Sequence, residues 1–148
     1  MQNLEVKIKR LNKDAKIPTY GTFYGAGADV YAVLSEPVTI YPHETKFIST
    51  GFALEIPEGT AMLLMARSGL SSKQGLGMAT GASVIDSDYR GELLVPLHNY
   101  SNQAKSISGG ERIAQMVFIP YYKATFEEVE TLSETSRSVG GFGSTGTK

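Results

Sequence analysis

The chain has 148 residues and a formal net charge of −1, so it has the size of one domain and no general electrostatic attraction to nucleic acid or acidic membranes. It contains no cysteine and only two histidines, His43 and His98. Disulfides, thiolate zinc sites, cysteine nucleophiles and a histidine-rich metal site within one chain are therefore excluded. The first residues lack the apolar run of a secretory signal, and no apolar run has the length of a membrane span. We expect a cytoplasmic protein, or an intracellular phage or viral one.

Short apolar runs separated by Gly, Pro, Asn and Ser fill most of the chain, and helical periodicity is almost absent. This pattern is typical of an all-β sandwich or barrel. Residues 6–9 and 52–56 alternate in character and predict half-buried strands, the second one ended by a turn at 57–59. Residues 61–65 and 113–119 are largely apolar and predict central strands that are buried on both faces.

Two further elements are predicted in the middle of the chain. Residues 93–97 predict a strand in which Pro96 marks an edge or a bulge, because proline cannot donate a hydrogen bond to a neighbouring strand. One short helix is predicted after Arg67, with Ser68 as the cap of 69–74.

The character of the chain changes at about residue 131. The last 18 residues hold only Leu132, Val139 and Phe142 as sizeable apolar side chains, among Gly, Ser and Thr. Such a segment cannot bury enough apolar surface to order itself alone. We therefore expect a β domain over residues 1–130 and a flexible, Gly-rich C-terminal arm over residues 131–148.

Five segments are too polar and too rich in glycine for plain core β-structure. They are residues 26–32 (AGADVYA), 67–70 (RSGL), 81–92 (GASVIDSDYRGE), 110–116 (GERIAQM) and 140–146 (GGFGSTG).

Two of these segments have residue types that suit phosphate chemistry. Arg67, Ser68 and Gly69 combine a guanidinium, a hydroxyl and free N–H groups at a helix start, which suits a phosphate; a capped helix with a surface arginine is the alternative. Asp86 follows an apolar run and precedes a turn at 87–91, so we read the unit as a β-hairpin that carries a general base. A turn-capping aspartate is the alternative there.

The other polar residues are open to two interpretations as well. Phe142 lies among glycines, where its ring can lie on a nucleobase while neighbouring N–H and hydroxyl groups bind phosphate; the alternative is a disordered tail. Arg112 and Gln115 lie in or beside an apolar strand, where polar groups need partners. For Arg112 we favour a structural hydrogen bond or a subunit contact.

In this order and at this spacing, the five segments resemble the five motifs of the trimeric dUTPase family, over residues 18–146. The resemblance implies a distorted jelly roll with one short helix, assembled as a homotrimer. Each active site draws residues from all three chains and receives the C-terminal arm of a neighbour. The implied activity is that of a dUTP diphosphatase, in which water attacks the α-phosphate and releases dUMP and diphosphate. This reaction keeps uracil out of DNA and supplies dUMP.

The resemblance also implies a role for each motif residue. Asp86 is the general base, and Asp29 contacts, through water, a Mg²⁺ that the triphosphate mainly holds. Tyr89 packs on the deoxyribose and excludes a 2′-hydroxyl. The hairpin before Asp86 reads uracil through backbone groups, which mismatch cytosine and leave no room for the thymine methyl. The substrate-binding residues are Arg67, Ser68, Gly69 and Gln115 at the phosphates, Thr80, Ser83, Val84 and Ile85 at uracil, Arg137 at the γ-phosphate, Phe142 over the base, and Gly143, Ser144 and Thr145 at the remaining oxygens.

The chain departs from the family pattern at three positions. Ser83 and Ser138 stand where the family often has Gly, and Ala66 stands where it often has Pro.

Two other functions stay open at this point. One is a dCTP deaminase of the same fold, for which Glu92 and Glu111 are the candidate second carboxylates. The other is a non-catalytic, nucleotide-binding jelly roll.

Overall fold

The computed structural model describes residues 3–141, and residues 1–2 and 142–148 lie outside the described range. The described chain is an all-β protein with a helix of seven residues, which confirms the expected class. No helix within residues 3–141 is long and apolar enough to cross a membrane. The elements are β1 (Lys7–Arg10), β2 (Thr19–Tyr20), β3 (Ala28–Tyr31), β4 (Val38–Ile40), β5 (Thr45–Glu55), β6 (Thr60–Met65), α1 (Ser68–Gln74), β7 (Leu76–Met78), β8 (Ala82–Ile85), β9 (Glu92–Asn99), β10 (Lys105–Ile107) and β11 (Arg112–Pro120).

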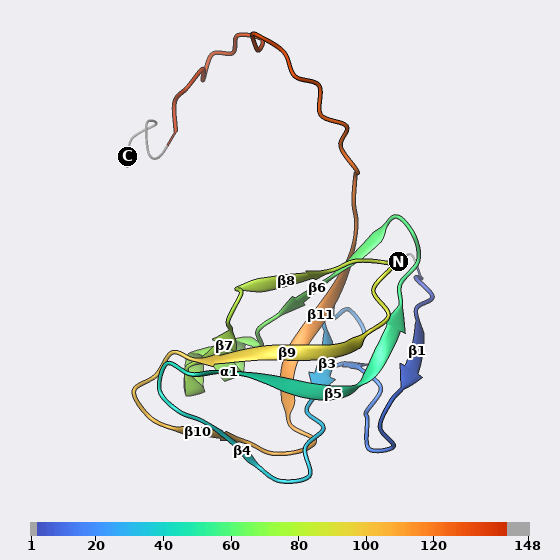
Figure 1. Ribbon diagram of the computed structural model, residues 1–148, viewed down its shortest axis with the longest axis vertical. Coiled ribbons are helices and arrows are strands. Elements are labelled where there is room, and N and C mark those ends of the chain that lie inside the picture. The colour runs from blue at the N-terminus through green and yellow to red at the C-terminus, as the bar shows by residue number, and fades with distance from the viewer. Residues whose placement is uncertain (1–2, 142–148) are drawn as a thin grey trace.

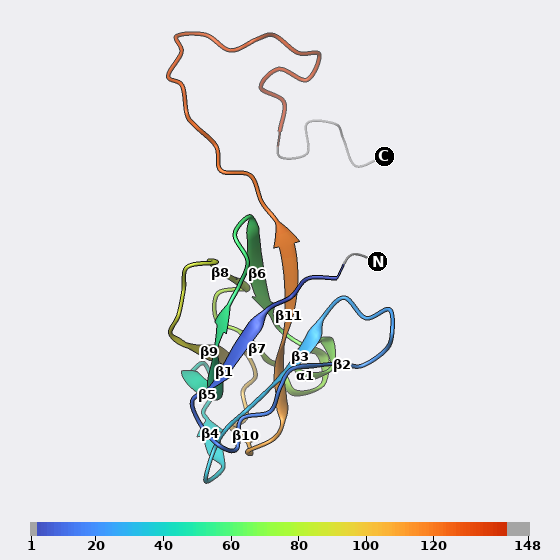
Figure 2. The ribbon, with the colours of Figure 1, turned by 90° about the vertical axis from the view of Figure 1, so that its right-hand side faces the viewer.

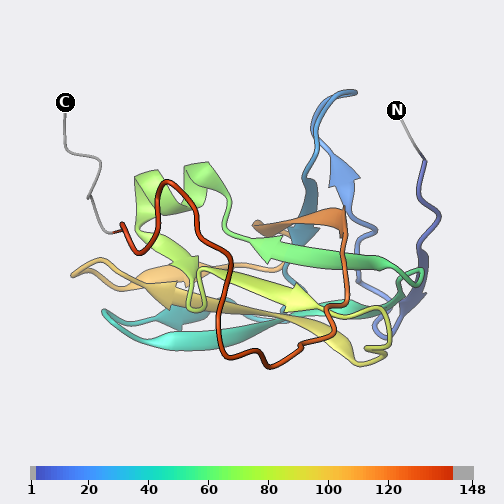
Figure 3. The same ribbon diagram turned by 90° about the horizontal axis from the view of Figure 1, so that it is seen from above.

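Two antiparallel sheets form the body, as in a jelly roll (Figure 1). The five-stranded sheet has the order β2-β3-β11-β6-β8, and the four-stranded sheet has the order β1-β5-β9-β7. A third, two-stranded sheet of β10 and β4 lies at one end of the body, as Figure 2 also shows. Seen from above, α1 stands at the end of β6 (Figure 3).

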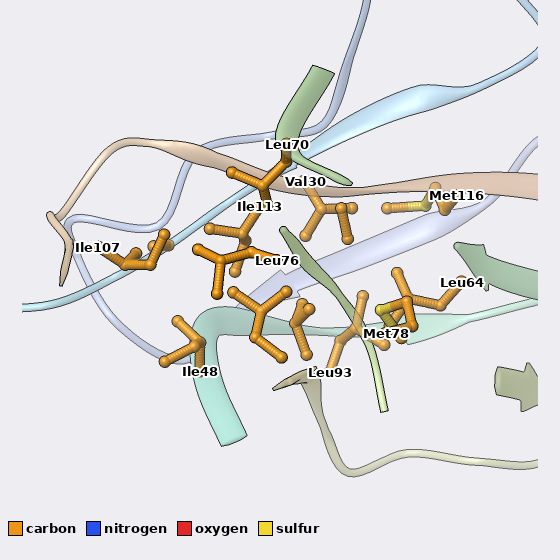
Figure 4. Close-up of a cluster of buried hydrophobic side chains, with 14 of the residues drawn as sticks. Val30, Ile48, Leu64, Leu70, Leu76, Met78, Leu93, Ile107, Ile113 and Met116 are labelled. Carbon is orange, nitrogen blue, oxygen red and sulfur yellow. The ribbon is translucent and has the colours of Figure 1, made fainter. Parts of the chain in front are cut away.

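The core fills the space between the two larger sheets (Figure 4). Val30, Leu64 and Ile113 point into it from the five-stranded sheet, and Ile48 and Leu76 point into it from the four-stranded sheet. Each of them is at most 2% exposed, and burying such a side chain contributes roughly 1.5–3 kcal/mol. Because both sheets and α1 share this core, the ends of their strands are held at fixed positions.

β6 and β11 lie inside the five-stranded sheet, as predicted, but only one of their faces is fully covered. Met62, Leu64 and Met116 are buried, whereas Leu63 and Val117 on the opposite face are only half-buried. The prediction that both faces are buried is therefore wrong for the single chain. No second layer of the described chain covers the outer face.

Pro96 lies in β9, which is neither an edge strand nor bulged at this residue, so that prediction is corrected. β9 pairs with β5 on one side and with β7 on the other, and its register shift lies between Ser49 and Ala53 of β5. The Pro96 carbonyl accepts a hydrogen bond from Ala79 N at 2.8 Å, just past the end of β7. The missing N–H of Pro96 therefore faces a point at which the neighbouring strand has already ended.

The helix and the expected hairpin also differ from the sequence-based predictions. α1 begins at Ser68 with Arg67 as its N-cap, and no side chain caps it. β8 pairs with β6, while β9 belongs to the other sheet, so β8 and β9 form no hairpin. The chain instead crosses from one sheet to the other through residues 86–91.

β11 ends at Pro120, and Tyr121 N still donates to the Gly59 carbonyl at 3.2 Å. From there to residue 139 the chain is exposed and contains no strand or helix. This segment leaves the body at the end of β11 (Figures 1 and 2). The strand body therefore stops ten residues before the expected boundary at residue 130.

A surface ion pair joins the two strands at the edge of the four-stranded sheet. Lys7 and Glu55 are opposite each other in the β1–β5 register, and Lys7 Nζ lies 2.7 Å from Glu55 Oε1. This hydrogen bond raises the pKa of Lys7 and lowers the pKa of Glu55. Because both side chains are exposed, the pair adds little to stability.

Candidate active site

A cleft of about 330 Å³ opens where the β2–β3 loop, β3, β11 and the start of α1 meet. Apart from Ala26, the residues that line it are polar or are glycines. Its lining residues are Gly21, Thr22, Gly25, Ala26, Gly27, Asp29, Arg67, Ser68, Gly69, Arg112 and Gln115. The structure thus brings together three of the five sequence segments that we singled out, the first, the second and the fourth, as walls of one cleft. The third segment lies on and after the edge strand β8.

Asp29 is the centre of the polar network in this cleft. It is 8% exposed, and its two carboxylate oxygens bind two arginines. Arg67 Nε donates to Asp29 Oδ1 at 2.7 Å, and Arg112 Nη1 donates to Asp29 Oδ2 at 3.2 Å. One carboxylate between two guanidinium groups leaves a net positive charge in the cleft. The remaining N–H groups of both arginines can bind an anion, with phosphate as the best geometric match.

Gln115 fixes the wall opposite the helix start. Its Nε2 donates to the Ala66 carbonyl at 2.9 Å, directly before Arg67. A Cβ at Gly27 would collide with Gln115 Oε1 and lie 3.2 Å from Gln115 Cδ. Gly27 is therefore needed for the side chain of Gln115 to lie where it does. The contact with Ala66 connects β11 to the start of α1.

Ser68 and Gly69 are exposed and form the first turn of α1. Because no side chain caps this helix, N–H groups of its first turn remain available to a ligand. The expected grouping of Arg67, Ser68, Gly69 and Gln115 is therefore present in one chain.

Asp86 and Tyr89 lie at a different place. Asp86 follows β8 and is exposed, and Tyr89 is 46% exposed with its N–H bonded to the Asp86 carbonyl at 3.2 Å. In the β6–β8 register, Ile85 is opposite Met62 and Ala82 is opposite Met65. Asp86 is thus beside the start of β6, whereas Arg67 follows its end, roughly 20 Å further along the strand. Within one chain the two groups do not meet.

The residues expected at uracil lie on or before the edge strand β8. Thr80 Oγ1 and Ser83 Oγ are 2.8 Å apart and share a hydrogen bond, and Gly81 between them has a φ of 72°. Val84 is 62% exposed, and Ile85 is half-buried. The hydroxyl of Ser83 thus has a partner, so the backbone accommodates a side chain at this position.

Arg137 is exposed in the segment that leaves the body at the end of β11 (Figure 1). Arg137 Nε donates to the Gly140 carbonyl at 2.9 Å, and Ser138 N donates to the Thr135 carbonyl at 3.1 Å. Ser138 has a φ of 44°, in the left-handed region that favours glycine. Phe142, Gly143, Ser144 and Thr145 lie outside the described residues.

Sequence reasoning missed the place of Arg112 in the cleft. Its partner Asp29 is 83 residues away in the chain, so no local pattern indicates the pair. A buried aspartate requires cationic partners, and this is the signal that could have found Arg112.

The two carboxylates considered for a deaminase, Glu92 and Glu111, accept hydrogen bonds from groups outside the cleft. Glu92 accepts from Ser49 and Gly51, and Glu111 accepts from Ser108 N at 2.9 Å.

The chain resembles proteins of known sequence and structure over nearly its whole length. The dUTPase family profile matches residues 13–146. The deoxyuridine 5′-triphosphate nucleotidohydrolase of Hahella chejuensis is 47% identical over 150 residues, which cover 99% of each chain. That of Nautilia profundicola is 48% identical over 143 residues, covering 97% of this chain and 99% of the relative.

Solved structures agree with these relatives. The Staphylococcus bacteriophage 80alpha dUTPase with dUPNHPP has a TM-score of 0.88 and 30% identity, covering 96% of this chain and 98% of the phage protein. A variant dUTPase of S. aureus phage phi11, whose structure describes the coordination of a structural Mg(II) ion, has a TM-score of 0.79 and 26% identity, covering 88% and 99%. The cleft, the fold and these relatives agree, and the chain belongs to the dUTPase family.

Proposed function

We infer that this chain is a dUTP diphosphatase, which hydrolyses dUTP to dUMP and diphosphate. The observation that carries the inference is the cleft in which Asp29 holds Arg67 and Arg112 beside the uncapped start of α1. Such a site suits the oxygens of a triphosphate. Relatives near 47% identity are named for this reaction, and a 30% identical phage enzyme binds a dUTP analogue. A nucleoside triphosphate substrate also suits an enzyme that acts in the cytoplasm.

In the proposed reaction, Asp86 accepts a proton from the water that attacks the α-phosphorus. The bond between the α-phosphorus and the bridging oxygen breaks, and diphosphate leaves with that oxygen. Arg67 and Arg112 neutralise the charge that develops on the phosphate oxygens, and N–H groups at Ser68 and Gly69 hold them in place. Gln115 fixes the wall of the cleft through its hydrogen bond with Ala66.

The base would be read by backbone groups of the edge strand β8. This strand pairs with β6 on one side, and within residues 3–141 no strand pairs with its other side. An unpaired strand edge offers alternating donors and acceptors, which match the O4 and N3–H of uracil and mismatch cytosine. Thr80, Ser83, Val84 and Ile85 supply this edge, and Tyr89 beside it packs on the deoxyribose.

Mg²⁺ would enter with the triphosphate. Within residues 3–141 no group of three metal-ligating side chains is present, and both oxygens of Asp29 are bonded to arginines. One such carboxylate suits contact with a hydrated ion through water, with the phosphates as the main ligands. Bound there, Mg²⁺ would neutralise phosphate charge and orient the chain of phosphates.

A homotrimer with shared sites would bring the separated groups together. Asp86 of one copy would face the Arg67 cleft of another. The two groups would then meet, although they lie roughly 20 Å apart along β6 within one chain. The outer face of the five-stranded sheet runs between these two places and carries apolar side chains that the chain itself leaves half-buried or exposed: Leu63, Met65, Val84, Val117 and Ile119. An apolar sheet face of this kind suits burial against a second copy.

The arm of a further copy would close the site. Arg137 would bind the γ-phosphate, Phe142 would cover uracil, and Gly143, Ser144 and Thr145 would bind the remaining phosphate oxygens. An arm that is exposed from residue 121 to residue 139 is long enough to reach a neighbouring chain.

The test is product formation from dUTP, dCTP, UTP and dTTP, with and without Mg²⁺. We expect dUMP and diphosphate from dUTP, with far slower turnover of the other three nucleotides. Glu92→Gln provides the control for deamination, because glutamine keeps the hydrogen-bond acceptor but cannot act as a base. Ammonia from dCTP, or no diphosphate from dUTP, would contradict the proposal.

A further inference from the structure

Tyr89 is held by contacts that the reaction itself does not require. Its hydroxyl donates a hydrogen bond to the backbone carbonyl of Glu92 at 3.0 Å. Its ring lies directly over Gly91. A Cβ built at Gly91 would lie 2.6 Å from Tyr89 Cζ, 2.9 Å from Cε2 and closer still to the hydroxyl oxygen.

Gly91 is therefore a glycine because of the ring and not because of its backbone. Among residues 3–141, positive φ angles occur at five other glycines, and Gly91 is not one of them. An alanine can adopt its backbone conformation, so the cost of a side chain at this position is the displacement of the Tyr89 ring.

Glu92, which supplies the accepting carbonyl, is itself anchored to the opposite strand. Its Oε1 accepts hydrogen bonds from the Ser49 hydroxyl and, at 2.9 Å, from Gly51 N. Both partners lie where β5 departs from regular pairing with β9, and Gly51 there has a φ of 70°. The irregular part of β5 thus fixes Glu92, and Glu92 fixes the hydroxyl of Tyr89.

The loop between Asp86 and Glu92 is braced on its other side as well. Arg90 Nη1 donates to the Ser87 carbonyl at 2.6 Å and to the Tyr89 carbonyl at 3.1 Å. Gly91 thus lies against the hydroxyl end of the Tyr89 ring, and Tyr89 is still 46% exposed.

We propose that Gly91 and Glu92 are the positioning residues for sugar selection: they fix the Tyr89 ring before the nucleotide binds, so that no room is left for a 2′-hydroxyl. This inference rests on the proposed packing of Tyr89 against the deoxyribose. A ring that can shift by an ångström would admit a ribose, whereas an anchored ring cannot. Preorganisation of this kind costs nothing when the substrate binds.

The experiment compares kcat/KM for dUTP and UTP on the same preparations of variant enzymes. The ratio of the two values is independent of how much enzyme is folded, so a purely structural effect does not change it. In Gly91→Ala the ring must move, and we expect the dUTP preference to fall about tenfold or more. In Tyr89→Phe the ring remains but its anchor is lost, and we expect a fall of about threefold to tenfold.

Two substitutions of Glu92 provide a matched pair of variants. In Glu92→Gln the amide oxygen still accepts from Ser49 and Gly51, so the preference should stay within about twofold of the wild type. In Glu92→Ala the anchor is lost, and the preference should fall, as in Tyr89→Phe. The double variant Tyr89→Phe/Gly91→Ala should match Gly91→Ala alone, because both changes release the same ring.

Tyr89→Ala separates this inference from the function on which it rests. If Tyr89→Ala loses the dUTP preference while Gly91→Ala and Tyr89→Phe keep it, the positioning role is wrong and the role of Tyr89 stands. If Tyr89→Ala itself keeps the preference, both are wrong. Should Gly91→Ala fail to fold, Tyr89→Phe and the Glu92 pair decide the question in the same assay.

Discussion

The two ends of β6 differ in how completely one chain builds them. At the end near Met65, Asp29 binds both Arg67 and Arg112, and Gln115 binds the Ala66 carbonyl. At the other end, Asp86 is exposed, and within the described range no side chain bonds its carboxylate. The groups of the first end are held within a single chain because Asp29 offsets part of the charge of the two arginines. The second has no such bonded network among residues 3–141, in keeping with the proposal that different copies contribute the triphosphate cleft and the base.

The largest effect is expected where the incomplete end loses the carboxylate of Asp86. Asp86→Asn should lower kcat by a factor of roughly 10²–10⁴, because Asp86 is the proposed acceptor of the proton from water. Binding of a non-hydrolysable dUTP analogue with Mg²⁺, measured by calorimetry, should be retained. A variant that keeps more than about a tenth of the wild-type kcat would contradict the role of Asp86.

The next effect concerns the arm. A chain truncated after Glu134 should melt like the full chain yet lose nearly all turnover, because residues 122–141 donate no backbone hydrogen bond to the strands of the body. Ordering the arm costs on the order of 1 kcal/mol per residue, which only contacts with nucleotide would recover.

Fluorescence gives an independent measure of the arm. The chain has no tryptophan, so Phe142→Trp introduces a single reporter, whose emission should change when the analogue and Mg²⁺ are added. Near-normal kcat/KM in the truncated enzyme, or emission that ignores the nucleotide, would contradict closure.

The two arginines near Met65, Arg67 and Arg112, should differ in how much their loss lowers kcat/KM. The Arg67 side chain is 26% exposed and 2.7 Å from Asp29, whereas Arg112 is 51% exposed and 3.2 Å away. Loss of a charged hydrogen bond costs about 1.5–3 kcal/mol. We expect Arg67→Ala to lower kcat/KM roughly a hundredfold and Arg112→Ala about tenfold. Equal losses of kcat/KM in steady-state assays would show that the burial of an arginine does not decide how much it contributes.

The smallest effect on kcat/KM is expected for substitutions of Ser138, in the turn at residues 135–138 of the arm. Ser138 has a φ of 44°, which valine adopts at an additional cost of about 1 kcal/mol. If the turn persists in the closed arm, Ser138→Val should lower kcat/KM about fivefold. Ser138→Gly should stay within about twofold, since glycine relieves the strain but adds flexibility. A Ser138→Val enzyme with unchanged kinetics would mean that the turn opens on closure.

Local patterns in the sequence predicted the β class, the strands around 52–56 and 93–97, and the single helix, since alternation and breaker residues act over a few positions. They did not predict which strands pair. The proposed hairpin after Val84 followed the rule that neighbouring strands pair, but β8 pairs with β6 through Ile85 and Ser83. Long-range pairing depends on the whole core, which no short window contains.

Local patterns in the sequence indicated the residue types of the candidate site, whereas its division among copies was an expectation from the family resemblance alone. Arg67, Ser68 and Gly69 lie together because they are consecutive, whereas the bond from Arg67 to Asp29 spans 38 residues. The separation of Asp86 from Arg67 follows only from the β6–β8 register. The apolar runs of β6 and β11 predicted strands that are buried on both faces, whereas the single chain leaves the outer face half-buried. The proposed trimer would cover that face.

Subunit complementation tests the division of the site most directly. Asp86→Asn and Arg67→Ala chains, each nearly inactive alone, are refolded together in equal amounts and assayed for diphosphate release from dUTP. If each site takes Asp86 from one copy and Arg67 from another, random assembly of trimers gives about a quarter of the sites an intact pair, and about a quarter of the wild-type activity returns. Activity no higher than the sum of the two separate variants would show that each chain uses its own Asp86 and Arg67, and would contradict the shared site.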